Sequence, residues 1–129
     1  MAVSFNHTIV AARNREESAA YFTELFGLPP ARELGPFLAV TLEHGASLDF
    51  AQAADGLDIH PQHYAFLVDE VDFDAIYGRI SQRGQRHWAD PRGTLEDEIN
   101  HRDGGRGVYF QDPSGHYLEI ITRPYGATG

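Results

Sequence analysis

The hydrophobic and polar positions of the first fifty residues predict a strand, a helix and three further strands. Residues 4–12 (SFNHTIVAA) contain the β-branched run expected of a strand. From Arg13, apolar residues recur at helical spacing, acidic residues occupy the first turn, and Gly27 ends the segment before two prolines. Three short strands are expected next, at residues 31–34, 37–42 and 47–51.

The same order of elements begins again after a Gly- and Pro-containing linker at residues 53–62. Residues 63–69 (HYAFLVD) predict a strand, and residues 72–82 predict a helix with Asp72 as its N-cap. Further strands are expected at residues 86–89, 108–111 and 117–122. The pattern therefore predicts an α+β fold built from two βαβββ modules, approximately residues 4–52 and 63–123.

The size of the modules indicates that they depend on each other. Each is too small to bury much apolar surface alone, so the two are expected to pair, either within one chain or across a dimer. The whole chain of 129 residues fits a single domain, residues 1–129. Its 42% hydrophobic and 22% charged content is close to the globular average, which favours a packed core over disorder.

The charge balance excludes several classes of function. The chain has 19 acidic and 10 basic residues, for a formal net charge of -9, and every basic residue is Arg. A nucleic-acid or membrane partner is not expected, because binding to phosphates requires a basic patch. The absence of Lys also excludes Schiff-base chemistry and a phosphate-loop lysine.

The chain also has no Cys, which excludes disulfides, a Cys nucleophile and thiolate zinc sites. Histidines and carboxylates remain as candidate metal ligands. The first ten residues lack the charged and apolar regions of a signal peptide, and no stretch approaches the roughly 18 apolar residues of a membrane span. We therefore expect a cytoplasmic protein.

Two histidines and one carboxylate stand out against the repeat. His7 lies in the first strand of the first module, and His63 opens the first strand of the second. Glu119 interrupts an apolar run in the last strand (HYLEII), where a carboxylate is costly unless it is paired or bound to a metal. Two His and one carboxylate form the facial set of non-haem Fe²⁺ sites, and the same ligands bind Mn²⁺, Ni²⁺ or Zn²⁺. The sequence thus predicts a divalent metal site.

Four segments resemble the vicinal oxygen chelate superfamily, which includes glyoxalase I, extradiol dioxygenases, fosfomycin-resistance thiol transferases and bleomycin-binding proteins. They are NHTIV, YFTELFGL, HYAFLVD and GVYFQDPSGHYLEI, and the resemblance extends over approximately residues 5–123. It implies that paired βαβββ modules form an open barrel around a metal, which binds two neighbouring oxygens of a small-molecule substrate. It also implies that the metal ligands are His7, His63 and Glu119.

The C-terminal third resembles the signature of the extradiol dioxygenases. The motif runs I-N-H, six residues, V-Y, two residues, D-P-S-G, three residues and Glu119. By this resemblance His101 and Tyr109 would be catalytic: His101 could donate to a developing negative charge, and Tyr109 could hydrogen-bond a substrate oxygen. The implied reaction is oxygenation of a catechol-like substrate with Fe²⁺ as the preferred metal. A further His of these enzymes is replaced here by Asp49.

Three other functions remain open. Asp49 lies at about the point where glyoxalase I carries a fourth metal ligand, which makes it a candidate fourth ligand or general base of a lyase or isomerase. The fosfomycin-resistance thiol transferases share a similar C-terminal ending, but their anion-binding Lys has no counterpart here. A metal-free small-molecule-binding protein, like the bleomycin-resistance relatives, is the alternative to an enzyme. The complete ligand set argues against it.

The resemblance also implies an assembly. Short two-module chains of this superfamily commonly form dimers whose modules pair across the interface. We therefore expect a homodimer with two sites, in which His7 comes from one subunit and His63 and Glu119 come from the other.

Overall fold

The chain folds into two α+β units, Met1–His60 and Pro61–Gly129. The structure is a computed structural model and describes residues 2–126. The division falls inside the linker predicted at residues 53–62, so each unit contains one of the two predicted modules. The expected α+β class is confirmed, with an open sheet in each unit.

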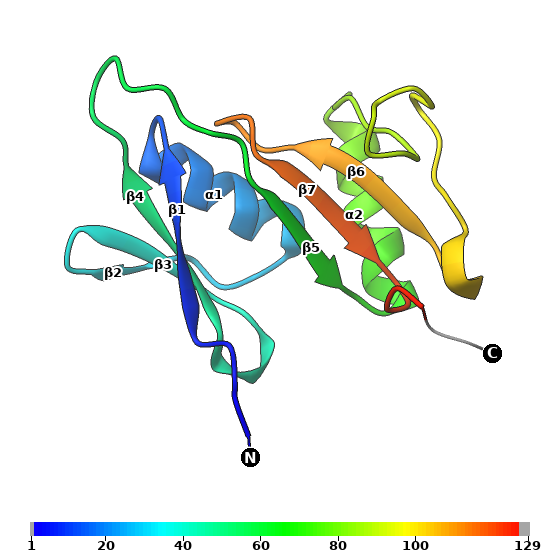
Figure 1. The fold of residues 1–129 in the computed structure, drawn as a ribbon, viewed down its shortest axis with the longest axis horizontal. Helices are drawn as coiled ribbons and strands as arrows, with labels where there is room; N and C mark the ends of the chain where they lie inside the picture. The colour runs from blue at the N-terminus through cyan, green and yellow to red at the C-terminus, as the bar shows by residue number, and fades with distance from the viewer. Residues whose placement is uncertain (1, 127–129) are drawn as a thin grey trace. The chain divides into compact units, whose positions relative to one another are not determined.

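The first unit contains its elements in the predicted order (Figure 1). They are β1 (His7–Ala12), α1 (Arg15–Phe26), β2 (Arg32–Leu34), β3 (Phe37–Thr41), the 3-10 turn η1 (Glu43–Gly45) and β4 (Ser47–Gln52). The strands form one sheet in the order β1-β4-β3-β2. β1 runs parallel to β4, and the other neighbouring strands are antiparallel.

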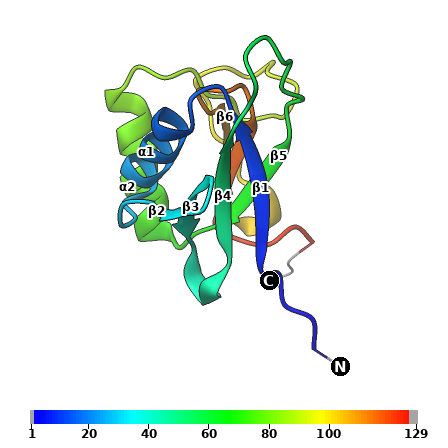
Figure 2. The same cartoon turned by 90° about the vertical axis from the view of Figure 1, so that its left-hand side faces the viewer.

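Local sequence sets both ends of α1. The Asn14 side chain accepts a hydrogen bond from the backbone N–H of Glu17 at 2.9 Å, which caps the first turn. Gly27 ends the helix at a φ of 69°, a left-handed conformation that favours glycine. The helix covers one face of the sheet (Figure 2), where the rings of Phe22 and Phe50 pack with centroids 6.2 Å apart.

Alternation along the strands gives this sheet a helix-facing side and an open side. The helix-facing side is apolar and buried, and it includes Val10, Val40, Leu48 and Phe50. The intervening residues of each strand point away from α1. In the register of the strands, this open side carries the polar residues His7, Arg32 and Asp49. The same alternation that buries the core therefore places His7 and Asp49, the two candidate metal ligands of this unit, on the side of the sheet away from α1.

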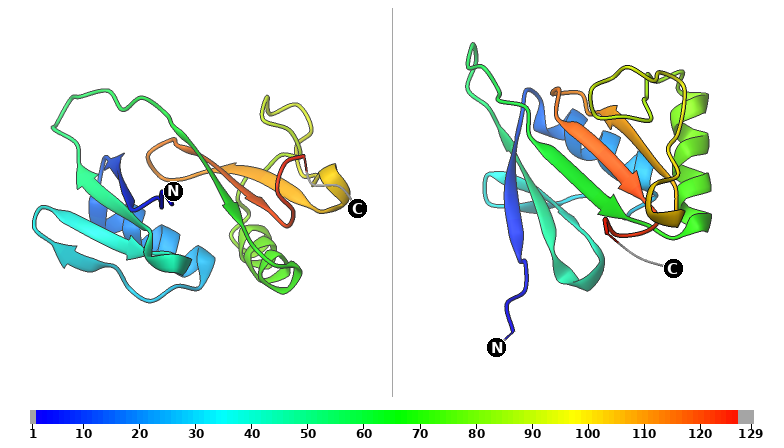
Figure 3. Two further views of the ribbon diagram at one scale, coloured as in Figure 1. Left: turned by 60° about the horizontal axis from the view of Figure 1, so that its bottom comes forward. Right: turned by 45° about the vertical axis from the view of Figure 1, so that its right-hand side comes forward.

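The second unit has three paired strands and one long helix. Its elements are β5 (His63–Leu67), α2 (Glu70–Gln82), the 3-10 turn η2 (Arg102–Gly104), β6 (Gly107–Gln111) and β7 (Tyr117–Ile121). The strand order is β5-β7-β6, with β5 parallel to β7 and β6 antiparallel to it. α2 lies on one face of this sheet (Figure 3). His63, Tyr109 and Glu119 share a face in the strand register.

The strand predicted at residues 86–89 is wrong. Of residues 86–89, Trp88 alone pairs with β6, through reciprocal backbone hydrogen bonds with Tyr109 of 2.9 and 2.8 Å. The chain then turns back on itself, because the Asp90 carboxylate accepts hydrogen bonds from the backbone N–H groups of Thr94 and Leu95. The segment therefore leaves β6 after one paired residue and does not form a strand of this sheet.

The predicted N-cap of α2 is also wrong. The helix begins at Glu70, and the cap is Asp69, whose side chain accepts a hydrogen bond from the backbone N–H of Asp72 at 2.7 Å. Asp69 and Asp72 are both of a residue type favoured at N-caps, and they lie three positions apart. The sequence was therefore compatible with two start positions for this helix. The earlier start adds a turn to the helix and leaves Asp72 inside it.

Both helices are short. α1 has 12 residues and α2 has 13. A membrane-spanning helix requires about 20 apolar residues. Within the part of the chain that the structure describes, no helix combines the length and the hydropathy needed to cross a bilayer.

Candidate metal centre and ligand pocket

His63 and Glu119 form a close pair on the sheet of the second unit. Ala65 pairs with Glu119 in the parallel register, so His63 lies one diagonal step away on the same face. Nε2 of His63 is 3.0 Å from Oε1 of Glu119. Glu119 is 0% exposed, whereas the His63 side chain is 48% exposed. A buried carboxylate therefore faces an imidazole that a ligand can reach.

The separation of these two atoms suits two ligands of one metal ion. Two metal–ligand bonds of about 2.1 Å at right angles place their ligand atoms about 3.0 Å apart. A fully buried carboxylate also loses its hydration, and a cation next to it offsets that loss. The pair thus fits a divalent metal ion in both spacing and charge.

A chain of hydroxyl groups continues from the second oxygen of Glu119. Tyr125, just after β7, donates its O–H to Oε2 of Glu119. The hydroxyl oxygens of Tyr125 and Tyr109 are 2.8 Å apart, and Nη1 of Arg102 donates to Tyr109 Oη at 3.2 Å. The Tyr109 ring also lies beside that of His63, with centroids 6.0 Å apart. Tyr109, predicted as a catalytic residue, therefore lies next to the predicted metal ligands.

Burial keeps these phenols protonated. Desolvation raises the pKa of Tyr109 above its usual range, and the adjacent Glu119 raises it further. Desolvation is likewise the main cause of the raised pKa of Tyr125, followed by its hydrogen bond to Glu119. Both hydroxyls are therefore hydrogen-bond donors at neutral pH.

His101, the other predicted catalytic residue, lies outside this network. It precedes η2, its side chain is exposed, and it makes no hydrogen bond or ion pair with residues 2–126. The neighbouring Arg102 reaches Tyr109 instead. The catalytic role of His101 stays a prediction.

His7 of the first unit has the free ring nitrogen that a metal ligand needs. Its Nδ1 is 2.6 Å from Oδ1 of Asn6. An amide oxygen only accepts hydrogen bonds, so Nδ1 carries the proton and Nε2 of the neutral ring keeps its lone pair. A hydrogen bond on the other ring nitrogen is typical of metal-bound imidazoles, because it fixes the tautomer and the ring orientation.

Asp49 occupies the position in the first unit that Glu119 occupies in the second. Ile9 pairs with Asp49, and Ala65 pairs with Glu119, so each carboxylate has the same relation to the histidine of its unit. Asp49 is 5% exposed and accepts a hydrogen bond from Oγ of Ser47 at 2.8 Å. The predicted repeat therefore extends to a carboxylate in each half.

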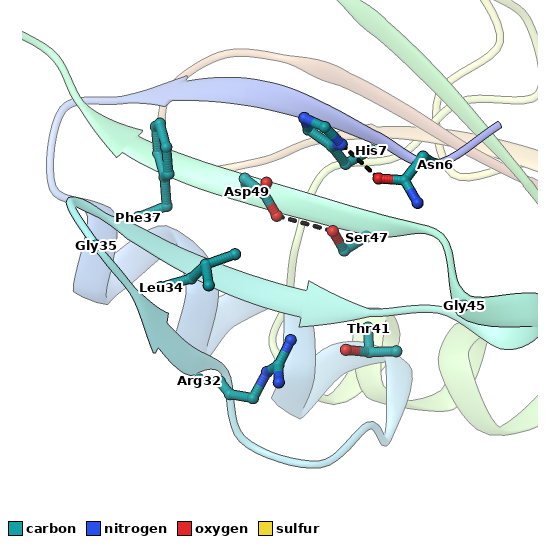
Figure 4. Close-up of a pocket in the computed structure, with 10 residues that line it drawn as sticks. All are labelled: Asn6, His7, Arg32, Leu34, Gly35, Phe37, Thr41, Gly45, Ser47 and Asp49. Atoms are coloured by element: carbon teal, nitrogen blue, oxygen red, sulfur yellow. Dashed lines mark hydrogen bonds between the residues drawn. The ribbon is translucent and has the colours of Figure 1, made fainter.

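The open side of the first sheet contains a pocket of about 590 Å³ (Figure 4). His7 lines it from β1 and Asp49 from β4, while Arg32, Leu34 and Phe37 line it from β2 and β3. Their side chains point to the side of the sheet away from α1. The sequence left the orientation of Asp49 open, and the structure places it toward the same space as His7.

Each unit by itself offers two of the candidate ligands. In the described range, 2–126, no three His, Asp or Glu side chains are grouped closely enough to hold a metal ion. The three-ligand set predicted from the sequence takes His7 from the first unit and His63 and Glu119 from the second. That set stays a prediction, as does Asp49 as a fourth ligand.

Comparison with known families decides where the chain belongs. The Glyoxalase/Bleomycin resistance protein/Dioxygenase superfamily matches residues 4–120. The chain belongs to this superfamily. The resemblance inferred from the four sequence segments is therefore confirmed over nearly the whole chain.

Two solved oxidases of similar size resemble this superfamily member. Oxidase ChaP-H2 is 52% identical with a TM-score of 0.96, and the match covers 100% of both chains. Oxidase ChaP-H1 is 51% identical with a TM-score of 0.93, and the match covers 98% of this chain and 100% of the other.

Two curated relatives are named as transferases. The glutathione transferase FosA of Serratia marcescens is 29% identical, over 93% of this chain and 81% of its own length. The metallothiol transferase FosB of Shouchella clausii (strain KSM-K16) is 27% identical, over 95% of this chain and 82% of its own length.

Two residues of the network could not be found from the sequence. Tyr125 lies beyond the last strand, in a segment without a motif, and Arg102 adjoins a histidine that drew attention first. Their contacts depend on how the segments after β7 and before β6 return to the sheet. For Tyr125, the sequence signal is its position close to the end of the strand that contains the buried carboxylate of Glu119.

Proposed function

We propose that this chain is a metal-dependent oxidase or oxygenase that acts on a small aromatic substrate with two adjacent oxygens. The observation that carries the proposal is the pair of His63 Nε2 and Glu119 Oε1, 3.0 Å apart, with the carboxylate fully buried. The two oxidases that are about half identical over the whole chain support oxidative chemistry.

The proposed metal ligands are His7, His63 and Glu119, with Fe²⁺ as the preferred ion and Mn²⁺, Ni²⁺ or Zn²⁺ as alternatives. When bound, Fe²⁺ would supply Lewis acidity toward the two substrate oxygens and redox chemistry with O₂. The three ligands combine neutral imidazoles with one carboxylate, which leaves a net positive charge for an anionic substrate oxygen. Asn6 orients the His7 ring for this task.

The protein's own hydroxyl groups would position the substrate and the carboxylate. Tyr125 donates to Oε2 of Glu119 and so leaves Oε1 directed at His63. Because the Tyr125 proton goes to Glu119, the single proton of Tyr109 goes to the Tyr125 oxygen. Tyr109 stays protonated and lies beside His63, so its O–H would donate to a substrate oxygen in exchange for this bond to Tyr125. Arg102 donates to the Tyr109 oxygen and holds the phenol in place.

A glyoxalase-like lyase and a fosfomycin-type thiol transferase are the alternative enzymes. Asp49 favours the first, because a second buried carboxylate faces the same pocket as His7 and could act as a general base. The names of the FosA and FosB relatives favour the second, although the identities of 29% and 27% are well below those of the oxidases. A metal-free binding protein is the alternative outside the enzymes.

Isotope labelling distinguishes these reactions. Iron-reconstituted protein is incubated with a panel of catechols under ¹⁸O₂, and the products are analysed by mass spectrometry. The expected result is a ring-cleaved product that contains both atoms of O₂, formed by the wild type and lost in His63→Ala. Oxidised products without ¹⁸O would assign the reaction to the oxidases. No oxidised product, or turnover only when a thiol or a 2-oxoaldehyde is supplied, would contradict the proposal.

A further inference from the structure

The pocket of the first unit contains an arginine whose charge is not neutralised by the protein. Arg32 lines the pocket from β2, and its side chain makes no hydrogen bond or ion pair with any residue in the described range 2–126. Arg15, Arg86 and Arg106 all have carboxylate partners. In a chain with a net charge of -9, a free guanidinium in a pocket is available to an outside anion.

Strand register explains why Arg32 has no internal partner. Arg32 pairs with Ala39 of β3, and Ala39 pairs with Asp49 of β4, so the two charges lie in one row but two strands apart. Their Cα atoms are therefore separated by about 10 Å. Asp49 is occupied by the Ser47 hydroxyl instead. The pocket thus has a cationic end at β2 and a hydrogen-bond acceptor at β4.

Apolar side chains line the same pocket as the free guanidinium. Leu34 is two residues along β2 on the same face, and it pairs with Phe37 of β3. Leu34 is 47% exposed although it belongs to a sheet, so its surface is open to a ligand. A planar apolar body against Leu34 and Phe37, with a negative group toward Arg32, satisfies both features.

From these contacts we propose that the pocket binds a flat aromatic ligand that carries a carboxylate or phenolate group, and that Arg32 binds this group. The volume of about 590 Å³ lies inside the usual range for small-molecule sites and accommodates more than one ring. His7 lines the same pocket, so under the proposed function this ligand is the substrate, and its hydroxyl end lies toward His7 and Asp49. That identification rests on the proposed function, whereas the binding of the anion does not.

Binding of two matched probes tests the proposal. 2-Naphthoate and its neutral analogue 2-naphthamide are titrated calorimetrically into protein that has been treated with a chelator. The wild type is expected to bind naphthoate about tenfold more tightly than naphthamide, because a hydrogen bond to a charged group is the stronger one. Arg32→Gln removes this preference. Arg92→Gln, an exposed arginine of the other unit, keeps it.

The location of binding provides the second readout. In ¹⁵N-labelled protein, naphthoate is expected to shift the amide signals of β2 and β3, and the Arg32→Gln spectrum without ligand shows that the variant is folded. Equal affinities for the two probes, a preference that survives in Arg32→Gln, no detectable binding, or shifts confined to the second unit would overturn the proposal. The probes lack adjacent hydroxyls and the metal has been removed, so these outcomes are independent of the proposed metal chemistry.

Discussion

At the scale of single residues, the second oxygen of Glu119 depends on one donor, the hydroxyl of Tyr125. Removing a hydrogen bond to a metal-binding carboxylate typically weakens metal binding by about 10–100-fold. Tyr125→Phe is therefore expected to bind Co²⁺ about 10–100-fold more weakly than the wild type, as measured by titration of the visible Co²⁺ absorption. The ring stays in place, so the loss reflects the hydroxyl alone.

A second tyrosine provides a matched control for this variant. Tyr77 loses one hydrogen bond in Tyr77→Phe, the 3.2 Å contact with Nε2 of His87, but it has no contact with Glu119. Tyr77→Phe should bind Co²⁺ like the wild type. Unchanged or tighter Co²⁺ binding by Tyr125→Phe would show that the hydroxyl does not orient the carboxylate.

The sequence allowed part of the site to be predicted at this scale. His63, Glu119 and Tyr109 were expected to lie together, and strand register does bring them to one face. Tyr125 and Arg102 were missed, because their contacts come from segments without regular structure, where no periodicity predicts the direction of a side chain. The unpaired charge of Arg32 was also beyond the sequence, since it depends on which strands are neighbours.

At the scale of elements, the turn between β6 and β7 is built around a half-buried carboxylate. Oδ1 of Asp112 accepts hydrogen bonds from the backbone N–H groups of Ser114 and His116, at 3.0 and 2.8 Å. Desolvation nevertheless raises the pKa of Asp112 above its usual range. The native state therefore keeps this proton to a higher pH than the unfolded chain.

The raised pKa gives Asp112 a definite effect on stability. Its contribution is fully present below the unfolded pKa of about 3.9 and is lost as the pH rises through the higher native pKa. Asp112→Asn keeps the Oδ1 acceptor but removes the charge. We expect a higher melting temperature than the wild type at pH 7 and no difference near pH 3, as measured by circular dichroism. A lower melting temperature of the variant at pH 7 would contradict this.

Elements with strong local signals were predicted most accurately. The Gly27 end of α1 and the strands at β3, β4, β6 and β7 agree with the pattern, since each is fixed by alternation or by a glycine. The segment at residues 86–89 has a similar composition, but the turn held by Asp90 draws it away from the sheet after one paired residue. The hydrogen bonds that decided this outcome join the Asp90 side chain to the backbone N–H groups of Thr94 and Leu95, which follow the segment.

At the scale of the whole molecule, the chain contains two units with the same arrangement of a histidine and a carboxylate. The first unit has His7 and Asp49 in the register that the second gives to His63 and Glu119. Neither unit alone has the three ligands of the proposed metal site, so that proposal requires groups from two units, either of one chain or of two chains. The homodimer implied by the superfamily stays a prediction.

The metal content of the protein tests the central proposal most directly. Wild type, Glu119→Gln and the control Glu43→Gln, an exposed carboxylate, are purified anaerobically and analysed by elemental mass spectrometry. We expect about one Fe per chain in the wild type and the control, and less than about a tenth of that in Glu119→Gln. A wild type that holds no Fe, Mn, Ni or Zn after reconstitution, or a Glu119→Gln variant with full metal content, would contradict a metal centre at His7, His63 and Glu119.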